Sequence, residues 1–148
     1  MLVRWIVAAF HLLALGIGLG GVWVRARALR HAHPDSLRSA FAADTAWGLA
    51  AALWISTGFY RVFGGLEKGS AYYLGNTAFH IKITLLVVIL GLEILPMLTL
   101  IRWRRELRRG ATLDLSRAPL LSRISVIQAA LIVGMVLAAT ATARGFGA

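Results

Sequence analysis

The sequence predicts an all-helical, polytopic membrane protein, an antiparallel bundle of four transmembrane helices that forms a single domain over residues 1–148. Of its residues, 59% are hydrophobic and 15% are charged, and the mean hydropathy is +0.74. A soluble domain of this length cannot bury so much apolar surface. The apolar residues gather in four runs of about 20, the length that a helix needs to cross a hydrocarbon core of roughly 30 Å. Because lipid offers no partner to exposed backbone, and the runs lack the alternation of barrel strands, each is interpreted as a helix.

The first run covers about 2–24 and carries Gly16 and Gly20 four residues apart. Small residues at this spacing let two helices approach closely in lipid. A cleaved signal peptide ending near residues 26–28 is the alternative interpretation. The run is longer than the apolar segment of a signal peptide, and the heavier positive charge follows it, so a retained transmembrane helix is favoured.

The second run covers about 44–63 and follows a connection in which Asp35 or Ser36 can cap a helix. Its small residues form another expected seam of close packing, at Gly48, Ala51 and Ala52.

The third run covers about 79–101, and Gly110 is expected to end its helix. Glu93 lies three residues before Pro96, which frees a backbone carbonyl about one turn earlier and bends the helix there. Three roles remain open for Glu93. It can relay protons, it can pair with Arg25 or with another interhelical donor, or desolvation can keep it protonated.

The fourth run covers about 124–143, with Ser116 as the candidate cap and Pro119 in the first turn of the helix. Small residues recur along it at a four-residue spacing. We expect this face to pack against the glycines of the first run; its members are Ala130, Gly134 and Ala138.

The basic residues predict the orientation. Eleven of the 16 Lys and Arg residues lie in the first and third connections, which face the same side in a four-span protein: Arg25, Arg27, Arg30, Arg38, Arg102, Arg104, Arg105, Arg108, Arg109, Arg117 and Arg123. The other five are Arg4, Arg61, Lys68, Lys82 and Arg144. The expected location is a bacterial inner membrane. By the positive-inside rule both connections face the cytoplasm, and both termini lie outside the cytoplasm.

The net charge of +10 favours lipid over nucleic acid as the partner, because the charge flanks apolar runs. We expect the arginines to contact anionic headgroups, and four helices enclose so little space that a homo-oligomer is a further expectation. The chain has no cysteine, which excludes disulfides, thiolate metal sites and covalent c-type haem.

His11 is the deepest basic side chain, roughly 13 Å from the outer end of its helix at about 1.5 Å per residue. An imidazole there can ligate haem iron, relay a proton or form an interhelical hydrogen bond. His80 lies at the rim, roughly 11 Å from His11 in depth, a difference that disfavours ligation of one iron by both. Met135 lies level with His11, which makes a His/Met ligand pair geometrically feasible.

Lys82 and Arg61 lie near the outer ends of their helices, roughly 5 Å and 3 Å deep. Both can extend to the interface. Alternatively they converge on an anion such as a propionate, a phosphate or a carboxylate. The residues expected to wall such a site, or to form an interfacial belt, are Trp54, Thr57, Tyr60, Tyr72, Tyr73 and Asn76.

Over nearly its whole length the chain resembles an uncharacterised family of predicted bacterial four-helix membrane proteins, to which no activity is assigned. The motifs that carry this resemblance are Ala43-Asp44-Thr45-Ala46-Trp47-Gly48, Gly58-Phe59-Tyr60-Arg61, and Lys68-Gly69 followed by Tyr72, Tyr73, Asn76, Phe79, His80 and Lys82.

Trp5, His11, Arg25 and Lys82 are similarly placed to residues of HemJ-type protoporphyrinogen oxidases and of the related copper-resistance membrane domains. That resemblance implies a b-type haem or a porphyrin held near His11.

The leading functional hypothesis is a membrane redox protein that binds haem b or porphyrin, with His11 as the metal ligand and with Arg61 and Lys82 receiving the propionates. His80 is a further candidate for the cofactor site, at its rim. Enzymatic, oxidoreductase-like activity is left open. One alternative is a small transport subunit with a path along Glu93 and Pro96. Another is a structural protein whose arginine-rich loops bind lipid or a soluble partner.

Overall fold

The chain folds into four long helices and one short one in the computed structural model, which describes residues 1–65 and 70–146. Lys68 and Gly69, singled out in the sequence, lie outside the described residues. The described part contains no strand. In chain order the helices are α1 (Leu2–Arg30), α2 (Pro34–Phe63), α3 (Ser70–Leu74), α4 (Thr77–Arg108) and α5 (Ala118–Ala143).

Each predicted run lies within one long helix, so the all-helical prediction is confirmed. Within the described residues, three helices are long and apolar enough to cross a membrane: α1, α4 and α5. α2 is not among them, because polar and aromatic residues interrupt its alanines and leucines. A crossing by α2 stays a prediction.

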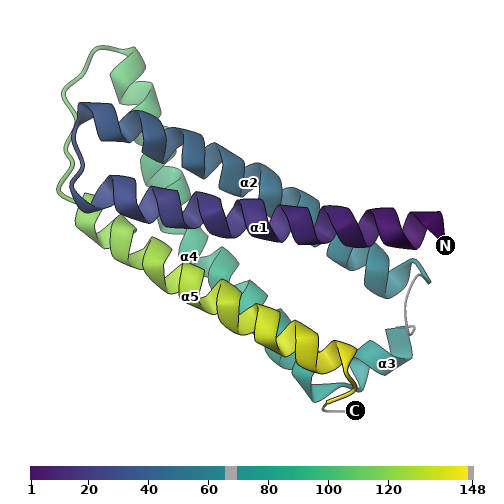
Figure 1. Cartoon of the computed structure of the whole chain (residues 1–148). Helices are drawn as coiled ribbons and strands as arrows, with labels where there is room; N and C mark the ends of the chain where they lie inside the picture. Colours follow the sequence, from purple (N-terminus) through teal and green to yellow (C-terminus); the bar gives the residue numbers. More distant parts are fainter. Residues whose placement is uncertain (66–69, 147–148) are drawn as a thin grey trace.

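Neighbouring helices run antiparallel (Figure 1). The Ser122 hydroxyl near the start of α5 donates to the Ala26 carbonyl near the end of α1, at 2.7 Å. At the opposite end, the Asn76 amide before α4 donates to the Phe146 carbonyl after α5, at 3.2 Å. We call the end with residues 31–33 and 109–117 the arginine-rich end, and the end with α3 and both termini the terminal end.

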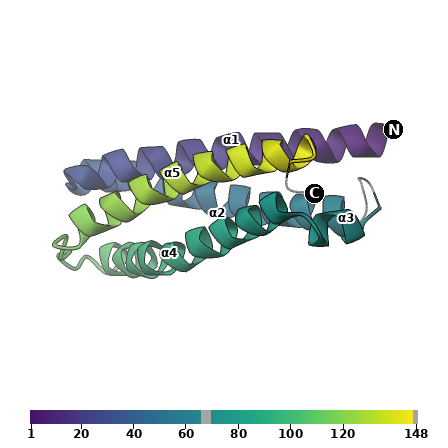
Figure 2. The same ribbon diagram turned by 90° about the horizontal axis from the view of Figure 1, so that it is seen from below.

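Two helix pairs, α1–α2 and α4–α5, make up the molecule, and they diverge toward the terminal end (Figure 1). Figure 2 shows α3 at this end, beside the start of α4. α1 packs along both α2 and α5, whereas contact between α2 and α4 is slight. One apolar cluster, which includes Trp47, Trp54 and Ile132, lies toward the terminal end. A second, which includes Leu29, Trp103 and Leu121, fills the arginine-rich end.

The glycines that bring helices together are not those that spacing predicted. A Cβ added at Gly18 would lie 3.2 Å from the Trp47 ring, and one at Gly21 would lie 3.0 Å from the Ala43 carbonyl oxygen. At Gly16, Gly20 and Gly48 an added Cβ would meet nothing within 4 Å, so the prediction of close packing there was wrong. The tight seam therefore joins α1 to α2.

Helix ends follow local signals, with two corrections. Gly110, at φ +69°, follows the end of α4 as predicted. α2 has His33 as its N-cap, and Ser36 contributes from the first turn by accepting from the His33 amide at 3.0 Å. Ser116 does not cap α5, whose N-cap position is Arg117. Pro119 lies in the first turn of α5 as expected.

Candidate functional site

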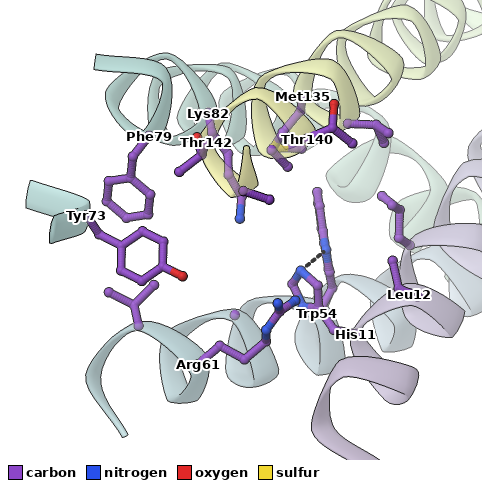
Figure 3. A pocket seen from close by; sticks show the side chains of 16 residues that line it. His11, Leu12, Trp54, Arg61, Tyr73, Phe79, Lys82, Met135, Thr140 and Thr142 are labelled. Atoms are coloured by element: carbon purple, nitrogen blue, oxygen red, sulfur yellow. Dashed lines mark hydrogen bonds between the residues drawn. The ribbon is translucent and has the colours of Figure 1, made fainter. Parts of the chain in front are cut away.

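A cavity of about 280 Å³ lies at the terminal end, where the two helix pairs diverge (Figure 3). Every long helix contributes to its wall, and so does α3. The lining side chains on which the argument depends are His11 of α1, Trp54 and Arg61 of α2, Tyr73 of α3, Phe79 and Lys82 of α4, and Met135, Thr140 and Thr142 of α5.

His11 is only 8% exposed, and both of its ring nitrogens are hydrogen bonded. The Trp54 indole N–H donates to Nε2 at 3.0 Å, and Nδ1 lies 2.9 Å from the Thr57 hydroxyl oxygen. Because an indole nitrogen can only donate, Nε2 must be the acceptor, so Nδ1 carries the proton and donates to Thr57. The Thr57 hydroxyl donates in turn to the Leu53 carbonyl at 2.7 Å. His11 is thus held as a neutral imidazole.

A glycine on α2 makes room for this imidazole. A Cβ added at Gly58 would lie 3.2 Å from His11 Cε1, closer than side chains normally pack. Because Gly58 has no side chain, the His11 ring of α1 can pack against α2 at this position.

The donor set fits haem iron poorly in this arrangement. His11 has no free ring nitrogen while Trp54 occupies Nε2. His80 lies outside the cavity lining, with its Nε2 2.8 Å from the Leu74 carbonyl. Met135 does line the cavity with His11. No group of three or more His, Cys, Asp or Glu side chains able to hold a metal occurs in the described part of the chain.

Lys82 and Arg61 reach into one cavity from opposite sides, Lys82 from the start of α4 and Arg61 from the last turn of α2 (Figure 3). The Lys82 ammonium group has no hydrogen-bond or ion-pair partner among the residues that the structure describes. No Asp or Glu occurs among the described residues that line the cavity. The described residues of the lining therefore carry positive charge and can receive an anion.

The predicted aromatic and polar walls are only partly present. Trp54 and Tyr73 line the cavity, and Thr57 orients His11. Tyr72 instead donates to the Thr142 carbonyl at 3.1 Å. Asn76 caps α4 by accepting from the Phe79 amide at 3.0 Å. Tyr60 is exposed on α2 and does not line the cavity.

A second polar cluster lies deeper, around Arg25, which has no exposed surface. Its guanidinium group donates to both carboxylate oxygens of Glu93, at 2.6 and 2.7 Å. It also donates to Asp44 at 2.9 Å, to the Gln128 carbonyl oxygen at 2.8 Å and to the Ser125 hydroxyl at 3.1 Å. All five N–H donors of Arg25 are therefore used.

The cluster extends to a second arginine and balances its charge. Arg104 donates to the other oxygen of Asp44 at 3.0 Å. The Gln128 amide donates to Glu93 at 2.8 Å and to the Ile89 carbonyl at 3.1 Å. Two guanidinium groups thus face two carboxylates, and all four long helices are joined. Glu93 lines neither the terminal-end cavity nor a smaller apolar cavity that adjoins it, so a transport path along Glu93 finds no support in the structure.

Residues 3–147 match the family model described as Predicted membrane protein (DUF2214). The chain belongs to this family. No curated protein and no solved structure matches the chain. The match to DUF2214, an uncharacterised family, agrees with the membrane protein that the sequence predicts.

The four residues of the HemJ resemblance do not gather at one site in this DUF2214 chain. His11 and Lys82 line the same cavity, but Trp5 is 67% exposed and Arg25 lies in the deeper cluster. Of the three roles left open for Glu93, pairing with Arg25 is the one that the structure contains.

Sequence reasoning missed most of the deeper cluster. The charge pattern places Arg25 and Arg104 in the connections, but both lie in helices and join the cluster with Asp44 of α2. No sequence motif points to Gln128 or Ser125. Gln128 is the only glutamine of the chain and interrupts the most apolar part of α5, which is a signal that could have found it.

Proposed function

We propose that this protein crosses the bacterial inner membrane four times and binds a small anionic ligand in the terminal-end cavity, on the side away from the cytoplasm. The observation that carries the proposal is the Lys82 ammonium group, which faces the cavity without a partner among the described residues. Charged groups within membrane-spanning segments are costly and usually belong to a functional site. An anionic group is the ligand that this lysine and the neighbouring Arg61 fit.

The direction of the helices supports a crossing by α2. α1 ends at the arginine-rich end, next to the start of α5, whereas α4 begins at the terminal end. α2 is the segment that carries the chain from one end to the other, packed lengthwise on α1. A helix packed along a membrane-spanning helix shares its depth in the bilayer.

The charge distribution supports the orientation. With Arg25 and Arg104 engaged in the cluster, nine basic residues remain at the arginine-rich end, against five elsewhere. The positive-inside rule then puts the arginine-rich end in the cytoplasm and the cavity outside it. Exposed arginines at this end, among them Arg105, Arg108 and Arg109, would contact anionic headgroups.

Haem b is a narrower candidate within the same proposal. Its propionates would fit Arg61 and Lys82, but ligation of iron by His11 requires Nε2 to leave Trp54. The cavity of about 280 Å³ is also small, since small-molecule pockets are usually about 300–1,000 Å³. A haem complex should therefore be sought spectroscopically: purified protein loaded with haem would show a Soret band that His11→Ala removes. An unchanged band in His11→Ala, or no band at all, would contradict a His11-ligated haem.

The broader proposal is tested by thermal unfolding of the purified protein in nanodiscs of a neutral phospholipid. The anionic probes are inorganic phosphate, hexadecyl phosphate and protoporphyrin IX. We expect at least one to raise the Tm of the wild type, with the rise lost in Lys82→Met and kept in Lys82→Arg. Arg4→Gln is the matched control, because Arg4 is an exposed cation outside the cavity. A Tm that no probe changes, or an equal rise in Lys82→Met, would overturn the proposal.

A further inference from the structure

A smaller, almost wholly apolar cavity of about 130 Å³ adjoins the terminal-end cavity. The two share His11, Trp54, Phe79, Lys82 and Met135 among their lining residues. The walls of the smaller cavity are large apolar side chains from two helices, Ile55, Phe59 and Phe63 of α2 and Ile83 and Leu86 of α4. Lys82 thus lies at the boundary between the terminal-end cavity and the smaller apolar cavity.

This apolar cavity has walls from α2 and α4 and lies near the outer surface of the bundle. Contact between these two helices is slight. Several wall residues also face the outside of the bundle, with Phe59 66% exposed and Phe63 53% exposed. In a membrane the outside of the bundle is in hydrocarbon, so a chain lying in the apolar cavity would be close to the acyl chains of the bilayer.

We infer that the ligand is a membrane amphiphile: a phosphate or carboxylate head group held by Lys82 and Arg61, with a hydrocarbon chain that leaves through the apolar cavity between α2 and α4. The inference rests on the anion site proposed above and names its ligand class. A water-soluble anion would use the charged cavity and leave the apolar cavity without an occupant. A neutral lipid would cover the apolar walls and leave Lys82 without a counter-charge.

Another groove provides an internal comparison. Gly16 and Gly20 of α1 face Val126, Ala130 and Val133 of α5 across an apolar groove whose lining has no charged side chain. Nothing in that lining would select a charged head group. Variants in this groove therefore control for the effect of added bulk on a lipid-facing surface.

The test separates head group from tail. The protein, in nanodiscs of a neutral phospholipid, receives hexadecyl phosphate, inorganic phosphate or hexadecanol, and the Tm and the affinity are measured. We expect hexadecyl phosphate to raise the Tm, and the other two to have little effect. Lys82→Met should weaken hexadecyl phosphate binding at least about tenfold, because a charge-assisted contact is lost. Ile83→Trp, which fills the apolar cavity, should also weaken binding, about fivefold or more.

Matched controls keep the outcome interpretable. Val133→Trp puts an indole of the same size in the uncharged groove, and Arg4→Gln removes an exposed charge at the same end. Both should bind hexadecyl phosphate as the wild type does, and circular dichroism establishes that every variant is folded. Lys82→Arg keeps the positive charge and should bind hexadecyl phosphate. Binding by this variant would show that Lys82→Met loses affinity through loss of the charge and not through a folding defect.

The contrary outcomes distinguish the two proposals. If inorganic phosphate binds as tightly as hexadecyl phosphate and Ile83→Trp has no effect, the amphiphile inference is wrong and the anion site stands. If hexadecanol binds as tightly as hexadecyl phosphate, or Lys82→Met changes nothing, the anion site fails as well. An equal response of all variants to hexadecyl phosphate would indicate a bulk effect on the membrane and would overturn both.

Discussion

Arg25 is a fully buried charge in a helix that is otherwise largely apolar. A charge is tolerated in such a place only when it is paired and its hydrogen-bonding groups are used. Glu93 and Asp44 supply the counter-charge, and Gln128 and Ser125 accept hydrogen bonds from the remaining N–H groups of Arg25. The geometry of Arg25 is therefore fixed by four residues from three other helices.

Arg25→Met is expected to destabilise the protein by about 3–5 kcal/mol, because it leaves the carboxylates of Glu93 and Asp44 close together and without their main partner. Adding Glu93→Gln to this variant removes one of the two charges and should recover part of the loss. Reversible unfolding in mixed micelles measures both free energies. Arg27→Met, an exposed arginine two residues away, is the control and should change stability little. Equal effects of Arg25→Met and Arg27→Met would contradict the role given to the cluster.

His11 illustrates what sequence alone leaves open for a single residue. Its depth made it the strongest candidate ligand, and an interhelical hydrogen bond was the other main interpretation. The structure contains the hydrogen bonds, to Thr57 and Trp54, because Gly58 admits the ring between α1 and α2. Neither partner could be assigned from the spacing of residues in separate runs.

At the scale of helices, apolar length predicted where each one runs but not where it ends. α1 continues six residues past the predicted run, to Arg30, and α2 begins at Pro34, ten residues before its run. Backbone hydrogen bonding does not stop at the edge of hydrocarbon, so helices continue until a local signal ends them. Pro34 at the start of α2 and Gly110 after α4 are such signals, and they can be read from the sequence.

The α1–α2 seam gives a test at this scale. Gly21→Ala would put a Cβ 3.0 Å from the Ala43 carbonyl oxygen and 3.2 Å from the Trp47 amide nitrogen, both of them backbone atoms that cannot move aside cheaply. We expect a loss of about 1–3 kcal/mol in the free energy of unfolding. Gly20→Ala, next to it in open space, should be neutral or stabilise by up to about 1 kcal/mol. Similar values for the two variants would show that α1 and α2 pack less closely.

At the scale of the whole molecule, the two helix pairs are tied together in the middle and diverge at one end. The charged cluster and the apolar residues of the arginine-rich end close that half of the bundle. The terminal end holds the cavity instead. This asymmetry agrees with the division that the sequence predicted, an arginine-rich anchoring side and a side with the candidate site.

The four-span topology can be tested because the chain contains no cysteine, so a single introduced thiol reports one position. Ser36→Cys lies at the start of α2 and Gly65→Cys just after its end. If α2 crosses the membrane, an impermeant maleimide added to intact spheroplasts should label Gly65→Cys and leave Ser36→Cys unlabelled until the cells are lysed. Labelling of both positions from outside would contradict the crossing and the orientation.

The sequence by itself determined the class of the protein, its four helical runs, and the end at which positive charge collects. These properties depend on composition within a local stretch of chain, which hydropathy and charge report directly. Only the tertiary structure decided that Arg25 meets Glu93, Asp44 and Gln128, and that Lys82 and Arg61 share a cavity with His11. These contacts depend on the rotation of each helix about its axis and on the place where the two helix pairs diverge. Side-chain packing between segments distant in the sequence determines the rotation and the divergence.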